Sequence, residues 1–555
     1  MYLILDNMLS NFDIQTVTEF SKNDKEIYGF LEANDGVFKN VLRLTLYGKQ
    51  SKKEIGQIAC FRDAFIEGFR NIFANSKLKA LIFQIDGSPD NVEFIKTTKR
   101  LFALTQIPHV YFEKEEQMRS SILVTSNISL NVGDRIVEVL IDNDGYIVSE
   151  LEYTDTGYVE REQRDCKPYK RMTAEKIRQR ILGSNYFVKI ICHANTPGFK
   201  PTKFLTKKVL NTVPLSKLMI MEEDLGKYNE AFVFETVKWM FDKSYVKFYV
   251  CQKSFRNYMI QFKYGDKYYP LILCKKHDIV PFNKVLTIPK SFLEFSHAYT
   301  GDNDVDVIVR DILNTPKEVH GLKFTYSIDE SNFITAANVT GIVSKKISRL
   351  CEKLDSKELT IPVIGFYGEL SFIYVKNDAN TSGYKLLDTW NGKKFFKIVF
   401  IEEVIQCKYG KDLYISFDGI KPKFFDDAVK TFESGSFSVV HDLIKIMSTP
   451  ASKLSTLNPT LGYTISSDSE HPVLIHFKNY CGEKKAATPA FLMAMLLKEH
   501  LKELKGIFGE KPTEIGFCIF DDFDGDSEAK NRVENGLKES CQLLGGLKCS
   551  FFESL

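Results

Sequence analysis

The sequence lacks the short motifs that assign many proteins to a catalytic class. It contains no GxxxxGK phosphate loop followed by Ser or Thr, no HExxH zinc motif and no GxSxG nucleophile elbow. Its 11 cysteines are scattered and odd in number, without a CxxC pair, so we expect reduced and mostly buried thiols. The 9 histidines show no metal-ligand spacing, so we expect no metal site.

An excess of one charge and long apolar runs are also missing. The 74 basic residues nearly balance the 72 acidic ones, leaving a net charge of +2 and no indication of a nucleic-acid partner. No segment approaches the roughly 18 apolar residues of a membrane span. The N-terminal MYLILDNMLSNFD lacks the basic region and apolar core of a signal peptide. We therefore expect a cytoplasmic protein, or alternatively a nuclear one, that binds neither nucleic acid nor membrane.

The sequence does contain the patterns of a globular protein with alternating strands and helices. Over 555 residues, 44% hydrophobic and 26% charged content predicts several domains with substantial cores. Asn143-Asp144-Gly145 is typical of a hairpin turn, because these residues tolerate positive φ. Residues 173–183 (TAEKIRQRILG) predict a helix with Thr173 as N-cap and Gly183 near its end. The alternation indicates an α/β or α+β class, and α/β is our prediction.

A long-period repeat is the most informative feature. Residues 29–116 and 462–553 contain the same succession of elements, offset by about 433–437 positions. Gly29-Phe30 matches Gly462-Tyr463, and in each copy a strand (41–48 or 473–482) and a helix are followed by a second strand, a second helix and a last segment, HVYFEKEE or LKCSFFE. This spacing predicts duplicated domain lobes rather than a solenoid.

A second feature is the change to short strands and turns between about residues 245 and 328. Within it, TIPKSFLEFSHAYTGDNDVDVIV (residues 287–309) resembles the segment "TIP…F(S/T)…A…DNQ…V-x-I-x-V" of the 70-kDa heat-shock chaperone family. EEDLGKYNEAFVFETVKWMF (residues 222–241) is similar to that family's "NPDEAVAxGAAxxA" helix. The repeat resembles the first lobe of its nucleotide domain, and these matches follow one another over most of the chain.

The resemblance implies actin-like (ribonuclease-H-like) ATPase lobes, duplicated or permuted, with a small β-sandwich-like peptide-binding module between them. It divides the chain into four parts. They are residues 1–116, a partial first-lobe copy; 117–242, a second lobe without the subdomain that caps adenine; 243–330, the β-rich module; and 331–555, a second copy of the first lobe.

The positions that would hold a nucleotide depart from the family pattern. The family's "GIDLGTT" loop corresponds to Gly365-Phe366-Tyr367-Gly368, without the Asp, and its "DLGGGTFD" loop to residues 130–135, where Gly133 alone remains. The resemblance makes Gly365, Gly368 and Gly133 vestigial phosphate-loop positions. Because phosphate cradling needs closely approaching backbone N–H groups, we expect no resident cofactor, with ATP and Mg as the alternative.

The acidic residue of the family's "NEP" motif corresponds to Glu116 and, in the second copy, to Glu553. These residues are vestigial catalytic candidates, although solvated carboxylates at strand ends are the simpler interpretation. Because the phosphate-loop residues of the family are lost, we expect a pseudo-ATPase rather than an active enzyme.

The resemblance also implies that the β-rich module binds peptides. We name Phe292, Phe295, Ala298 and Val305 as groove or groove-supporting residues, with β-domain core as the alternative role for this aromatic-rich stretch. The leading hypothesis is a degenerate, non-catalytic chaperone-like or scaffold protein that binds peptide or protein partners. The alternatives are an active or weakly active chaperone ATPase, and a purely structural protein whose lobes pair within the chain or in a homo-oligomer.

Overall fold

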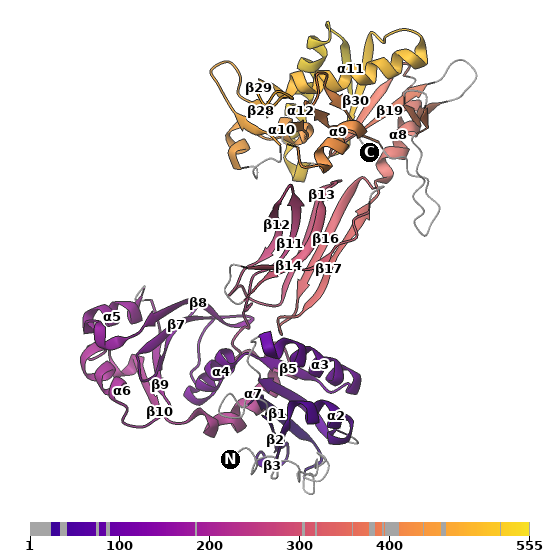
Figure 1. The fold of residues 1–555 in the computed structure, drawn as a ribbon. Helices are drawn as coiled ribbons and strands as arrows, with labels where there is room; N and C mark the ends of the chain where they lie inside the picture. The colour runs from indigo at the N-terminus through magenta and orange to yellow at the C-terminus, as the bar shows by residue number, and fades with distance from the viewer. Residues whose placement is uncertain are drawn as a thin grey trace.

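The computed structural model is an α/β protein with three lobes and a β-sandwich (Figure 1). The N-terminal and middle lobes lie together at one end of the sandwich, and the C-terminal lobe lies at the other end (Figure 1). The structure describes residues 24–33, 41–73, 77–84, 89–183, 186–301, 306–316, 319–357, 359–376, 383–390, 393–394, 410–436, 438–456, 462–521 and 523–553. Among these residues, no helix is long and apolar enough to cross a membrane.

The N-terminal lobe is a five-stranded mixed sheet in the order β3-β2-β1-β4-β5. Strands β1 to β3 form an antiparallel meander, and β4 and β5 continue parallel to β1. Phenylalanines of α2 and α3 pack on one face of this sheet. The elements are β1 (Ile27–Ala33), β2 (Val41–Gly48), β3 (Glu54–Phe61), α2 (Arg62–Ile72), β4 (Leu78–Gln84), α3 (Pro89–Thr105) and β5 (His109–Phe112).

The middle lobe repeats this arrangement in the order β10-β9-β6-β7-β8, again with three antiparallel and two parallel strands. Its last helix, α7, leaves its own sheet and packs on the second face of the N-terminal sheet. The elements are α4 (Lys114–Ser126), β6 (Arg135–Ile141), β7 (Tyr146–Thr154), β8 (Gly157–Cys166), η2 (Tyr169–Arg171), α5 (Ala174–Leu182), β9 (Lys189–Ala194), α6 (Lys200–Phe204), η3 (Leu205–Val209), η4 (Leu215–Lys217), β10 (Leu218–Glu222), η5 (Leu225–Tyr228) and α7 (Asn229–Phe241).

The sandwich consists of a four-stranded sheet, β12-β11-β14-β15, and a three-stranded sheet, β13-β16-β17, with a common apolar core. Strand β17 pairs with β16, so the predicted boundary at residue 330 separates two paired strands and the sandwich continues to Ile342. The elements are β11 (Tyr258–Tyr264), β12 (Lys267–Cys274), β13 (Phe282–Pro289), β14 (Glu294–Thr300), β15 (Val307–Ile312), β16 (Gly321–Ile328) and β17 (Ile334–Ile342).

The C-terminal lobe has the strand order β20-β19-β18-β30-β31, in which β19 is antiparallel to β18, and β30 and β31 are parallel to it. Its elements are α8 (Lys345–Asp355), β18 (Val363–Tyr367), β19 (Leu370–Lys376), β20 (Tyr384–Leu386), β21 (Thr389–Trp390), β22 (Lys393–Lys394), β23 (Lys411–Asp412), β24 (Ile415–Ser416), β25 (Lys423–Phe424), α9 (Asp426–Glu433), β26 (Val439–Val440), α10 (Leu443–Ser448), η6 (Ala451–Thr456), β27 (Thr464–Ser466), β28 (Leu474–Lys478), β29 (Lys484–Ala487), α11 (Pro489–Phe508), β30 (Glu514–Ile519), η7 (Phe523–Gly525), α12 (Ser527–Leu543) and β31 (Lys548–Glu553).

Local sequence sets the ends of several of these elements. The hydroxyl of Thr173 accepts a hydrogen bond from the amide of Lys176 and caps α5 as predicted. Thr488 caps α11 in the same way, with a proline at the first helical position, and Gly509 ends that helix with a φ of 79°. The turn predicted at residues 143–145 joins β6 to β7.

The repeat keeps its order of elements, but its two copies are paired differently. In the first copy β4 pairs with β1, the first strand of the same copy. In the second copy β27, β28 and β29 form a small sheet of their own, and β30 pairs with β18, far upstream in the chain. The structural counterpart of β1 is therefore β18 rather than β27.

Candidate functional site

The four-stranded sheet of the sandwich has two edge strands that differ in character. Strand β12 carries Lys267 and Pro270 and is paired to β11 through an irregular register, features that commonly protect an edge from further pairing. The other edge, β15, exposes 47%, 43% and 42% of Val307, Ile308 and Val309. An exposed run of β-branched residues on a sheet edge favours the addition of another strand.

The hydrogen-bond pattern shows which backbone groups of β15 face outward. The amide of Gly301 donates to the carbonyl of Asp306, and the amide of Leu313 donates to the carbonyl of Phe295. Because bonded and non-bonded positions alternate along an antiparallel pair, the peptide groups of Val307 and Val309 point away from β14. No other described strand pairs with them, and we call these donors and acceptors the β15 edge.

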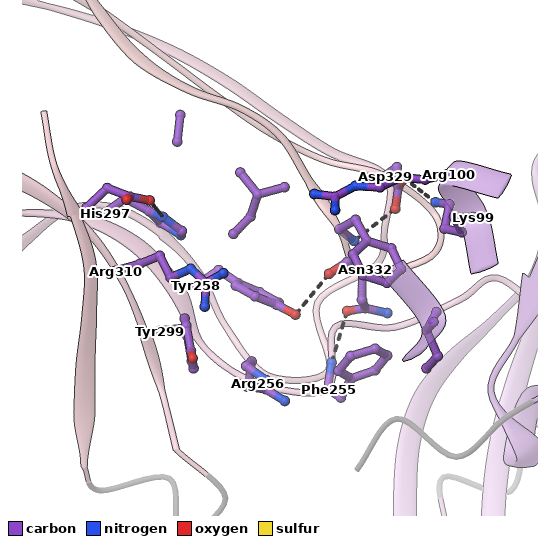
Figure 2. Close-up of a pocket in the computed structure, with 15 residues that line it drawn as sticks. Lys99, Arg100, Phe255, Arg256, Tyr258, His297, Tyr299, Arg310, Asp329 and Asn332 are labelled. Atoms are coloured by element: carbon purple, nitrogen blue, oxygen red, sulfur yellow. Dashed lines mark hydrogen bonds and ion pairs between the residues drawn. The ribbon is translucent and has the colours of Figure 1, made fainter. Parts of the chain in front are cut away.

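A cavity of about 490 Å³ lies beside this edge, where the sandwich meets the N-terminal lobe (Figure 2). We call it the junction pocket. It is lined from α3, from β11 and the segment before it, from β14 and β15, and from β17 and the β16–β17 turn. The lining residues are Ile95, Lys99, Arg100, Phe255, Arg256, Tyr258, His297, Tyr299, Arg310, Asp311, Asp329, Asn332, Phe333, Ile334 and Ala337.

Basic and aromatic side chains dominate the junction pocket. Lys99 Nζ lies 2.6 Å from the Asp329 carboxylate and above the ring of Phe333. The guanidinium of Arg256 lies 5.0 Å from the ring centre of Tyr299. With Arg100 and Arg310 also in the lining, basic side chains outnumber acidic ones, and the pocket favours an acidic or aromatic group.

His297 contributes a buried polar atom to the pocket. Its Nε2 has no hydrogen-bond partner among the described residues, and its Nδ1 lies 3.9 Å from the Asp311 carboxylate. Burial lowers the pKa of His297, although Asp311 opposes this effect, so the ring is neutral near pH 7. A neutral imidazole in a cavity can donate a hydrogen bond to a ligand or accept one from it.

The β16–β17 turn holds the pocket in shape. Asn332 has a φ of 61°, its amide group donates to the carbonyl of Lys253, and its side-chain oxygen accepts from the amide of Phe255. The hydroxyl of Tyr258 donates to the Asn332 carbonyl at 3.0 Å (Figure 2). These bonds join the turn to the segment that connects the middle lobe to the sandwich.

Of the predicted peptide-binding residues, Phe295 and Ala298 lie on β14 beside residues that line the pocket, but none of those described lines it. Phe295 and Ala298 are buried, and Phe295 packs on Phe324 in the sandwich core. Phe292 packs against Tyr414 of the C-terminal lobe. Val305 lies outside the described residues. The predicted segment therefore lies beside the pocket, but the residues of β14 that line it are His297 and Tyr299.

The three predicted phosphate-loop glycines occupy different structural contexts. Gly365 lies within buried strand β18, where a Cβ would approach Phe520 to 2.7 Å. Gly368 has a φ of 56° in the β18–β19 turn, and its amide already donates to the carboxylate of Asp521. Gly133 precedes β6, so the turn equivalent to β18–β19 in the middle lobe is instead at residues 142–145.

The two predicted catalytic glutamates are not brought together. Glu116 is buried near the start of α4, 3.8 Å from Lys253 Nζ, and burial raises its pKa. Glu553 is exposed at the end of β31, and its carbonyl accepts a hydrogen bond from Lys353 Nζ. The sandwich lies between the lobes that carry them (Figure 1).

The C-terminal lobe also brings together residues that their sequence spacing did not reveal. Glu369, in the β18–β19 turn, meets His441 and Asp442, which lie between β26 and α10. Their donor atoms all lie within 4.8 Å of one another. The absence of metal-ligand spacing in the sequence was therefore uninformative here, because the fold joins positions far apart in the chain.

No protein-family model matches the chain, and no curated protein matches it.

Proposed function

We propose that the protein is a non-catalytic, chaperone-like or scaffold protein that binds an extended segment of a partner polypeptide along the β15 edge. The observation that carries this proposal is the open row of apolar residues at Val307 to Val309 beside the junction pocket. An added strand would pair with the outward peptide groups, and one of its side chains would enter the pocket. The basic and aromatic lining favours a segment with an acidic or aromatic residue at that position.

We further propose that the lobes descend from actin-like ATPase lobes of the 70-kDa heat-shock type. Support comes from the strand order, which is the same in all three lobes: a meander whose first strand is followed by two parallel strands. The succession of two lobes linked by α7 and then a β-sandwich also agrees with the resemblance noted in the sequence.

The proposal of a pseudo-ATPase is supported by the β18–β19 turn. A phosphate loop needs backbone N–H groups that are free to approach an anion. At this turn the amide of Gly368 is bonded to Asp521, and a carboxylate in that position would repel a phosphate.

Peptide binding tests the proposal directly. Fluorescein-labelled peptides of varied sequence would be titrated with the full chain and followed by fluorescence anisotropy. Val309→Lys places a charge on the β15 edge and should weaken binding by at least about tenfold. Val285→Lys is the matched control, because Val285 is also exposed (55%, against 42% for Val309) but lies on β13 of the other sheet. Equal binding by wild type and Val309→Lys, or no binding by wild type below about 100 µM, would refute the proposal.

A further inference from the structure

Glu369, His441 and Asp442 form a compact group in the C-terminal lobe, away from the β15 edge. His441 Nδ1 lies 3.5 Å from Glu369 Oε1 and 3.3 Å from Asp442 Oδ2. Their side chains are only 11%, 8% and 23% exposed, respectively. We call this group the carboxylate–histidine cluster.

Two carboxylates so close together and so little hydrated require compensating positive charge. Oε2 of Glu369 is buried without a hydrogen-bond partner among the described residues. The cluster thus has more anionic capacity than its histidine alone neutralises.

The fold holds these donors in fixed positions. The ring of Tyr414 stacks on His441 with centroids 5.0 Å apart, and the hydroxyl of Tyr463 donates to the His441 carbonyl. The carbonyl of Glu369 accepts a hydrogen bond from the amide of Leu413. Residues that fix the orientation of ligating side chains are a general feature of metal sites.

The donor separations agree with metal coordination. Ligands about 2.1 Å from a tetrahedral metal ion lie about 3.4 Å from one another, and the two separations from the imidazole nitrogen are 3.5 and 3.3 Å. An imidazole with two carboxylates suits Zn²⁺, Mn²⁺, Fe²⁺ or Co²⁺ better than Mg²⁺ or Ca²⁺, which prefer oxygen ligands alone.

We propose that Glu369, His441 and Asp442 bind one divalent first-row transition-metal ion, with Zn²⁺ the best match to the donor geometry. The ion links the β18–β19 turn to the segment between β26 and α10. Solvent supplies the fourth ligand from the side of Asp442, the most exposed of the three side chains. The site stabilises the C-terminal lobe near its contact with the sandwich, because Tyr414 contacts both His441 and Phe292.

The test is metal uptake by the full chain after treatment with EDTA. Titration with Zn²⁺ by calorimetry should give one equivalent with a dissociation constant below about 10 µM. Co²⁺ should give the visible absorption bands of a four-coordinate site. Asp442→Asn and Glu369→Gln, which keep side-chain size, should each weaken uptake by at least about tenfold.

An exposed His–Asp pair in the same lobe provides the control. His471 Nδ1 lies 3.1 Å from Asp468 Oδ1, but this pair is solvated, and no second carboxylate of the described residues completes a cluster with it. Asp468→Asn should leave uptake unchanged. No Zn²⁺ or Co²⁺ uptake by the wild type overturns the proposal whether or not the variants fold. Uptake that persists in both Asp442→Asn and Glu369→Gln, with circular dichroism confirming their fold, overturns it as well.

Discussion

The N-terminal and C-terminal lobes have the same sheet topology but different surroundings. In both, a central strand (β1 or β18) pairs with an antiparallel neighbour on one side and a parallel strand on the other. The second face of the N-terminal sheet is covered by α7 of the middle lobe, whereas the second face of the C-terminal sheet is covered by α8 next to it in the chain. The same topology is thus completed by another lobe in one case and by a local helix in the other.

The C-terminal lobe also contains elements without a counterpart among the described residues of the N-terminal lobe. Between β20 and α11 the chain adds two small three-stranded sheets, β25-β24-β26 and β27-β28-β29. Their apolar residues join the core formed by α11, α12 and β30. This extra core predicts that the C-terminal lobe folds independently, while the N-terminal lobe depends on the middle lobe.

Truncating one core phenylalanine in each lobe should test this difference with the largest effect. Phe30 of β1 contacts Phe232 of α7, with ring centres 5.7 Å apart, whereas Phe517 of β30 packs within the C-terminal lobe. Each alanine substitution should cost about 3–5 kcal/mol. Hydrogen exchange should show that Phe30→Ala removes protection from both the N-terminal and middle lobes, while Phe517→Ala affects the C-terminal lobe alone. Loss of protection throughout the chain in both variants would contradict the comparison.

The middle lobe contains a buried ion pair between α4 and β6, and the pH dependence of its stability is a test of intermediate size. Glu138 of β6 is fully buried 3.6 Å from Arg119 Nε, and burial raises its pKa from 4.5 to about 7. Between these values the folded state keeps a proton that the unfolded state has released. Stability therefore falls as pH rises through this window, by about 3 kcal/mol, and is level above it.

Glu138→Gln cannot ionise and should not show this fall. Urea unfolding of the N-terminal and middle lobes, measured between pH 5 and pH 8, would compare the variant with the wild type. Glu152→Gln is the control, because hydrogen bonding to Arg161 lowers the pKa of Glu152 despite some opposing burial. A wild-type stability that is constant or rises between pH 5 and pH 7 would exclude the buried, protonated state of Glu138.

The repeat shows how much of the fold the sequence could predict. Its predicted strands and helices were correct, but the strands β3 and β29 were missed. The cap at Thr173 and the turn at residues 143–145 were also correct, because these depend on neighbouring residues. The pairing of β30 with β18 was not predictable, since apolar strands carry little information about which distant partner they join. The same limit hid the approach of Glu369 to His441.

The candidate site was likewise predictable only in part. The sequence directed attention to the stretch containing Phe295, and the structure places a pocket and an open edge beside it. Phe295 itself faces the core, because its large apolar side chain gains most by burial. Side chains alternate along a strand, so His297 and Tyr299 lie on the same side of β14 as Phe295. Unlike Phe295, they line the junction pocket, and this depends on the N-terminal lobe packed against the sandwich.

The smallest expected effect concerns the ion pairs at the two ends of the sandwich. Lys99 and Asp329 join the sandwich to the N-terminal lobe and are 21% and 22% exposed, whereas Lys290 and Asp412 join it to the C-terminal lobe and are 4% and 5% exposed. Water and salt screen the first pair, so Lys99→Ala should cost less than about 1 kcal/mol, and a double-mutant cycle with Asp329→Ala should give a coupling of that size. The coupling should decrease at high salt, because the pair is partly solvated. A salt-independent coupling of several kcal/mol would mean that the N-terminal end of the sandwich is held as rigidly as the C-terminal end. The junction pocket would then be closed rather than open to a ligand.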